Sequence, residues 1–247
     1  MLRERRLFRP EAAAALRALA NRDVNYRPVA EPVPSWTARW SLDALRCTVG
    51  REPPGEPVAG GAWEIACRLV REYQFADPRI VRTLYRPGDR LLGRDMLLEG
   101  RFLGLRFDLG VRVTSVIDET RRRGAAAERV WGWGYQTLDG HLEEGELRYE
   151  VIKQLETGTV EFVIQGYSRR APIADPIVRF GFHAFGRPTQ HRFYRLGGRR
   201  LYRMVQAELR GVPAPPPETV PGGEGLVVAP SPWSERAELG VERRSRA

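Results

Sequence analysis

The sequence has few cysteines and histidines, and it has no long apolar run. Its 247 residues include two cysteines, Cys47 and Cys67, and three histidines. Two cysteines so far apart match neither a disulfide framework nor the paired spacing of a zinc site, which favours a reduced, cytoplasmic protein. No apolar stretch approaches the ~18–20 residues that a membrane-spanning helix needs, and the first residues lack the apolar segment of a signal peptide. We therefore expect no membrane span.

Lysine is almost absent, because Lys153 is the only one and arginine carries nearly all of the basic charge. The formal net charge is +9, and the isoelectric point is about 10.2. A strongly basic protein can bind nucleic acid or an anionic surface. An excess of arginine over lysine is also typical of a GC-rich genome, and here the arginines are spread along the chain. We therefore expect at most weak, sequence-independent binding of nucleic acid, which salt abolishes.

Helical patterns occur near both ends of the chain. The alanine-rich segment 9–20 predicts a helix, and apolar residues every three or four positions predict another from Gly61 to Tyr73. Toward the C-terminus we expect two helices, one beginning near Pro176 and one over residues 188–209, because Gly186-Arg187-Pro188 interrupts the pattern. The Gly197-Gly198 pair predicts a kink or a close contact inside the second of these helices.

Strand patterns fill the middle of the chain. From Leu105 to Ile117 apolar residues alternate with polar ones, as in a sheet that is covered on one face only. A loop from Glu119 to Ala127 is expected to follow. The expected strands are residues 41–49, 80–85, 95–102, 105–117, 130–138, 145–155 and 159–168. This α+β pattern predicts an antiparallel sheet of six to seven strands, in a single domain over residues 1–211.

Proline and glycine dominate the chain from residue 212 onward. Such a composition buries too little apolar surface to offset the entropy of ordering, so residues 212–247 are expected to form a disordered tail. Trp233 and the segment from Leu226 to Val228 are the exceptions that could dock on the domain.

The most distinctive stretch, from Val130 to Val151, begins with an aromatic strand. Trp131, Trp133 and Tyr135 share one face of this strand because strand side chains alternate. Tyr149 is expected on the strand that pairs with it. Aromatic side chains in this arrangement either pack in the core or line a ligand cavity.

A polar loop from Asp139 to Gly145 follows the aromatic strand and carries His141 and Glu143. An imidazole oriented by one carboxylate suits general acid–base catalysis. The spacing of the acidic groups matches no metal site, so we expect no metal and no cofactor. The alternative is a solvated loop without chemistry.

The segment Thr137 to Glu146, TLDGHLEEGE, resembles the T-L-P-G-H-P-E-x-G-E signature of the family catalogued as domain of unknown function 1990. The resemblance covers most of residues 20–210, although Asp139 and Leu142 stand where the family favours proline. The family has no established activity. The resemblance implies a helix-grip fold (START or Bet v 1-like), in which a curved antiparallel sheet wraps around a C-terminal helix. That class commonly encloses an apolar ligand cavity.

These observations favour a protein that binds a small, largely apolar ligand between the sheet and the C-terminal helices. The expected ligand-binding residues are Trp131, Trp133, Tyr135, Tyr149 and His141. His141 and Glu143 would orient a polar group of the ligand. Two alternatives stay open: an enzyme that uses His141 and Glu143 as an acid–base pair, and a weak binder of nucleic acid or of an anionic surface through arginine-rich faces.

Overall fold

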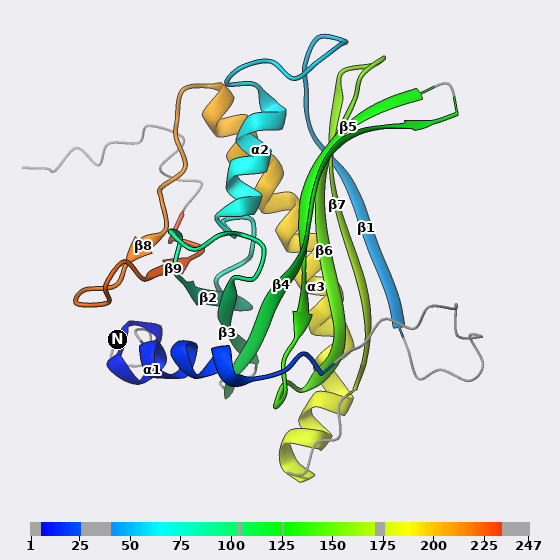
Figure 1. Cartoon of the computed structure of the whole chain (residues 1–247). Helices are drawn as coiled ribbons and strands as arrows, with labels where there is room; N and C mark the ends of the chain where they lie inside the picture. Colours follow the sequence, from blue (N-terminus) through cyan, green and yellow to red (C-terminus); the bar gives the residue numbers. More distant parts are fainter. Residues whose placement is uncertain (1–5, 26–40, 103–104, 125, 171–175, 234–247) are drawn as a thin grey trace, which may run out of the picture.

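The computed structural model of the chain describes residues 6–25, 41–102, 105–124, 126–170 and 176–233 (Figure 1). Its body is one nine-stranded antiparallel sheet with the strand order β1-β7-β6-β5-β4-β3-β2-β9-β8. The strands are β1 (Ser41–Arg51), β2 (Val81–Tyr85), β3 (Asp95–Phe102), β4 (Leu105–Arg123), β5 (Ala126–Thr137), β6 (Glu143–Gln154), β7 (Thr159–Arg170), β8 (Glu218–Thr219) and β9 (Val227–Ala229). The helices are η1 (Arg6–Phe8), α1 (Pro10–Ala18), η2 (Leu19–Asn21), α2 (Ala62–Arg71) and α3 (Pro176–Leu209).

The sheet is curved, and α3 lies along its inner face with α2 beside it (Figure 1). Side chains of both helices and of the strands meet there in the main core, for example the fully buried Leu69, Val151, Phe162 and Leu201. A second apolar cluster joins α1 to the outer side of β2, β3 and β9. The helix-grip arrangement that the sequence resemblance implies is therefore confirmed. None of the helices in the described part of the chain combines the length and the apolar character that crossing a bilayer requires.

All seven expected strands are present, and two further strands come from the chain that follows α3. We call residues 212–233 the C-terminal strap. The prediction of a disordered tail is wrong for this segment, because β9 pairs with the edge strand β2 and the side chains of Leu226 and Val228 are buried. The apolar run from Leu226 to Val228, which the sequence marked as an exception within the tail, finds hydrogen-bonding partners at the edge of the sheet. Residues 234–247 lie outside the described residues.

Polar contacts also hold the strap against the body of the protein. The backbone N–H of Ser231 donates to Gln74 Oε1 at 2.9 Å, and Gln74 Nε2 donates to the carbonyl of Pro215 at 3.0 Å. Arg200 of α3 donates to the carbonyl of Ser231 at 2.9 Å, and its guanidinium lies over the ring of Trp233. These bonds fix the strap at both ends, which agrees with the expectation that Trp233 could dock.

The segment from Glu119 to Ala127, expected to be a loop, mostly continues β4 and begins β5. The long hairpin is held by cross-strand ion pairs, in which Arg121 contacts Glu128 at 3.0 Å and Glu150 at 3.2 Å. Ion pairs of this kind stabilise neighbouring strands. They could not be predicted from the local sequence, because Glu128 and Glu150 lie on the two strands that follow β4. A bulge between Val113 and Ser115 also shifts the register of β4 against β5.

The two C-terminal helices that we expected form one helix, α3, which continues through Gly186 and Pro188. Its first turns lie at an angle to the rest (Figure 1), as a proline inside a helix commonly produces. The expected close contact at the glycine pair is confirmed. A Cβ on Gly198 would lie 2.8 Å from Cys47 Sγ, and one on Gly197 would lie 3.4 Å from the Phe75 ring.

Candidate functional site

The aromatic residues of β5 face the helices, as their alternation predicts. Trp131 and Trp133 are buried on this inner face. The indole N–H of Trp133 donates to the carbonyl of Val70 in α2 at 3.3 Å, and the guanidinium of Arg71 lies 5.0 Å from the Trp131 ring. Both indoles therefore join α2 to the sheet, and their polar or π surfaces already have partners.

Three tyrosine hydroxyls meet in the same interior, and we call Tyr73, Tyr135 and Tyr149 the tyrosine cluster. Tyr149 on β6 pairs directly with Trp133, and its hydroxyl is 3.4 Å from that of Tyr73. The Tyr135 hydroxyl interacts with both of the others. Burial raises the pKa of Tyr73 to about 12, and it also raises the pKa of Tyr135 and Tyr149 well above the ordinary value of a tyrosine. All three side chains are therefore neutral phenols that can donate hydrogen bonds.

Tyr73 was not recognised as a site residue from the sequence, where it only continues the apolar face of a helix. In the structure α2 ends before it, and Tyr73 has a φ of 60°. Its N–H bonds to the carbonyl of Val70, and the N–H of Gln74 bonds to that of Leu69, which is a Schellman ending. Glycine is the usual residue at that position, and another residue costs roughly 1 kcal/mol. Tyr73 adopts this strained conformation, and its ring is buried in the core.

The loop after α2 fills the middle of the space between the sheet and α3. Phe75 is fully buried, and its ring centroid lies 4.8 Å from that of Tyr149, 5.2 Å from that of Phe162 and 6.2 Å from that of Phe193. Close packing of aromatic rings leaves this region to the protein itself. The Phe75 side of the tyrosine cluster is therefore filled by side chains of the protein.

Toward the beginning of α3 the inner face of the sheet becomes polar. Asp43 on β1 is buried opposite Gly166 on β7, and an added Cβ on Gly166 would lie 2.5 Å from the Tyr194 hydroxyl. Burial raises the pKa of Tyr194, and the nearby Tyr135, Asp43 and Glu143 raise it further. We call this region, made by Asp43, Tyr135, Glu143 and Tyr194, the polar end.

His141 has a structural position in the turn between β5 and β6. Its Nδ1 accepts a hydrogen bond from the backbone N–H of Glu143 at 2.9 Å and lies 3.0 Å from the carbonyl of the same residue. Burial lowers the pKa of His141 to about 4. The imidazole is therefore neutral at pH 7, and its contact with Glu143 runs through the backbone.

Other residues of the motif close the same turn. The N–H of Gly145 donates to Thr137 Oγ1 at 2.9 Å, and this hydroxyl also bonds to the side chain of Asn25. The Asn25 amide in turn donates to the carbonyl of Glu143, and Gly140 has a φ of 85°. The signature segment is thus explained by the hydrogen bonds of one turn. No group of His, Cys, Asp and Glu side chains within the described residues is arranged to hold a metal ion.

Many of the arginines form ion pairs with acidic residues on neighbouring strands, loops or helices. Examples are Arg112 with Asp95 at 2.7 Å and Arg68 with Glu208. On the β4–β5 hairpin, Arg121 and Arg129 belong to this group. Pairing of this kind lets arginine stabilise the fold itself.

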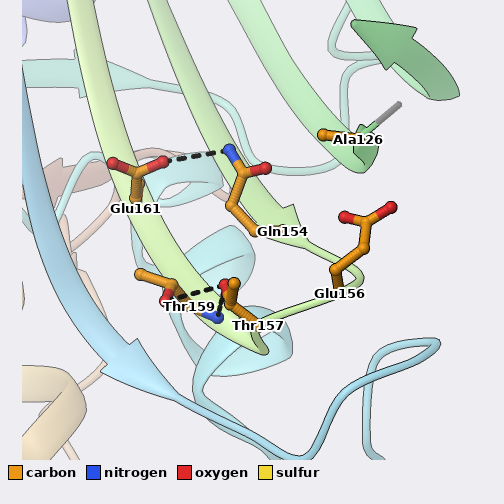
Figure 2. A pocket seen from close by; sticks show the side chains of 6 residues that line it. All are labelled: Ala126, Gln154, Glu156, Thr157, Thr159 and Glu161. Atoms are coloured by element: carbon orange, nitrogen blue, oxygen red, sulfur yellow. Dashed lines mark hydrogen bonds between the residues drawn. The ribbon is translucent and has the colours of Figure 1, made fainter. Parts of the chain in front are cut away.

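An open depression of about 460 Å³ lies on the outer face of the sheet, away from the predicted site. Figure 2 shows that its walls come from the ends of β5, β6 and β7 and carry mostly polar groups. Gln154 donates to Glu161 at 3.2 Å and to Glu128 at 2.8 Å, so the polar groups are already engaged with one another. None of the expected ligand-binding residues lines it.

Comparisons with known proteins complete the description. No curated protein matched the chain. Among solved structures, Ara h 8.0201 is similar, with a TM-score of 0.38 and 11% identity over 68% of this chain and 99% of that one. A norcoclaurine synthase point mutant of Thalictrum flavum, in complex with a transition-state analogue, has a TM-score of 0.40 and 8% identity over 69% of this chain and 96% of that one. The model of the family described as Domain of unknown function (DUF1990) matches residues 25–207, so the chain belongs to that family.

Proposed function

We propose that the chain binds a small, largely apolar ligand between the sheet and α3, at the Tyr135 side of the tyrosine cluster. The observation that carries this proposal is the convergence of buried, neutral phenols on an interior otherwise lined by aromatic and aliphatic side chains. An apolar lining with a few convergent polar groups and shifted pKa values is typical of ligand sites.

The roles of the expected residues divide accordingly. Tyr135 and Tyr149 supply ring surface and hydroxyl groups, and Glu143 lies close enough to Tyr135 to raise its pKa. Trp131 and Trp133 support these rings from the side of α2. His141 holds the turn that carries Glu143, so its contribution to the ligand is indirect.

The phenols determine which ligands the site prefers. A phenol with a raised pKa keeps its proton at pH 7 and donates it to an oxygen or nitrogen acceptor. The favoured ligand is therefore an aromatic or aliphatic molecule with one carbonyl, ether or similar acceptor at the end that reaches Tyr135. One such hydrogen bond contributes about 1 kcal/mol, or roughly fivefold in affinity.

The experiment uses the fluorescent probe N-phenyl-1-naphthylamine and two competitors of similar size, 2-acetylnaphthalene and 2-ethylnaphthalene. Only the first competitor has a carbonyl. We expect saturable probe binding by the wild type, and a loss of roughly fivefold in the affinity of 2-acetylnaphthalene alone in Tyr135→Phe. Tyr202→Phe is the matched control, because Tyr202 is 47% exposed on the outer side of α3. Absence of saturable probe binding by the wild type would refute the proposal.

A further inference from the structure

The outer side of α3 carries a row of arginines. Its members are all exposed: Arg192, Arg195, Arg199 and Arg203 on α3, and Arg210 directly after the last residue of the helix. Their spacings of three, four, four and seven residues place them on the same side of a helix. At 1.5 Å per residue the row is about 27 Å long. We call it the arginine row.

Within the described residues, no acidic side chain pairs with the first three arginines of this row, Arg192, Arg195 and Arg199. In the part of α3 whose side chains are described, Glu208 is the only acid, and it is engaged by Arg68 and by the N–H of Ala214. Within the described residues, Arg192, Arg195 and Arg199 have neither an ion pair nor a hydrogen bond. They differ in this respect from Arg112 and Arg121, whose carboxylate partners lie on the sheet.

Apolar side chains accompany the arginine row. Tyr202 is 47% exposed and Leu209 is 45% exposed, and both lie on the outer side of α3. The opposite side of the helix is buried, with Leu201, Met204 and Val205 inaccessible to solvent. Only a shallow strip of the helix therefore protrudes from the protein.

We propose that the arginine row docks on the anionic headgroups of a phospholipid surface. A nearly flat strip with exposed aromatic and aliphatic residues beside its arginines fits a bilayer interface, where such side chains enter the headgroup region. A DNA major groove about 12 Å wide requires a freely protruding helix, whereas α3 is embedded beside β1. The proposal is independent of the ligand site, because the row and the tyrosine cluster lie on opposite sides of α3.

Each basic residue at an anionic membrane surface contributes about fivefold to the partition coefficient. We therefore expect the triple variant Arg192→Gln, Arg195→Gln, Arg199→Gln to lose about 100-fold in binding to anionic vesicles. The measurement is co-sedimentation of the full chain with vesicles of phosphatidylcholine and phosphatidylglycerol (3:1), with pure phosphatidylcholine vesicles as the reference, at 0.15 M and 0.5 M salt.

The matched control removes the same charge elsewhere, by Arg17→Gln, Arg90→Gln and Arg122→Gln, at three exposed arginines outside α3. We expect this control to lose less than about fivefold, and both triple variants to keep the wild-type melting temperature, since the replaced side chains are exposed. A second variant, Tyr202→Ala with Leu209→Ala, tests the apolar contribution and is expected to bind several-fold more weakly than the wild type.

Three results would overturn the proposal. Equal losses in the two triple variants would show that only the net charge matters. Equal binding to the two kinds of vesicle would show that the headgroup charge is not recognised. Tighter binding of a labelled 20-base-pair DNA duplex than of anionic vesicles, lost in the α3 variant, would assign the arginine row to nucleic acid.

Discussion

Replacement of Leu226 by alanine tests most directly whether the C-terminal strap belongs to the folded domain. Leu226 is 2% exposed and lies in the apolar cluster that joins α1, β2, β3 and the strap. Truncation of a buried leucine to alanine costs about 2–5 kcal/mol, because it removes apolar contacts and leaves a cavity. Taking about 3 kcal/mol, and about 2–4 °C for each kcal/mol in a protein of this size, we expect the melting temperature to fall by roughly 6–12 °C.

The assay is thermal unfolding followed by circular dichroism, with Leu42→Ala as the matched control. Leu42 is 78% exposed on the edge strand β1, so its truncation is expected to change the melting temperature by no more than about 2 °C. A strap that does not dock would make the two variants indistinguishable. A change below about 1 °C for Leu226→Ala would therefore refute the arrangement of β9 against β2.

Further predictions concern the interior charges and one turn. Lys153 is fully buried and donates to Glu52 at 2.7 Å. Lys153→Met is therefore expected to lower the free energy of unfolding, measured in urea, by about 3–5 kcal/mol, and the added Glu52→Gln should restore part of this loss. Equal stability of the single variant and the wild type would contradict this. The folded-state pKa of His141, about 4, lies below its ordinary value of 6.5. The unfolded chain therefore binds the proton first, and the stability that is complete above pH 6.5 should fall by about 3 kcal/mol as the pH drops to 4. His141→Asn, which keeps an acceptor for Glu143, should flatten this pH dependence, and an unchanged pH profile would disprove the assignment. Gly158→Ala should lower the melting temperature by several degrees, because Gly158 has a φ of 70° and an added Cβ would lie 1.8 Å from the carbonyl oxygen of Glu52. Gly55→Ala is the control that separates the backbone strain from the steric clash, since Gly55 also has a positive φ but has open space around it.

Local patterns determined most of the sheet and the orientation of its aromatic residues. Alternation along β5 placed Trp131, Trp133 and Tyr135 on the inner face, and the structure confirms that they are buried there. This works because the side-chain period of a strand is a property of the backbone itself. The glycine pair of α3 likewise indicated a close contact from local sequence alone, although the identity of its neighbours, Cys47 and Phe75, did not follow.

Long-range partners decided the features that the sequence left unresolved. Composition alone described residues 212–233 as a tail, whereas the unpaired edge of β2 gives their short apolar run a place to pair and to be buried. Likewise, His141 and Glu143 are neighbours in sequence, yet the turn joins them through the backbone.

For the candidate site, the sequence alone identified the rings on one strand but not the group that completes them. Tyr73 belongs to the cluster because α2 ends in a strained turn that directs its ring toward Tyr149. A hydroxyl cluster depends on where three separate elements meet, and no local periodicity encodes that meeting point. The sequence by itself therefore determined the seven strands from β1 to β7, their buried faces and the family. Only tertiary packing decided which side chains share an interior and which arginines of α3 remain exposed.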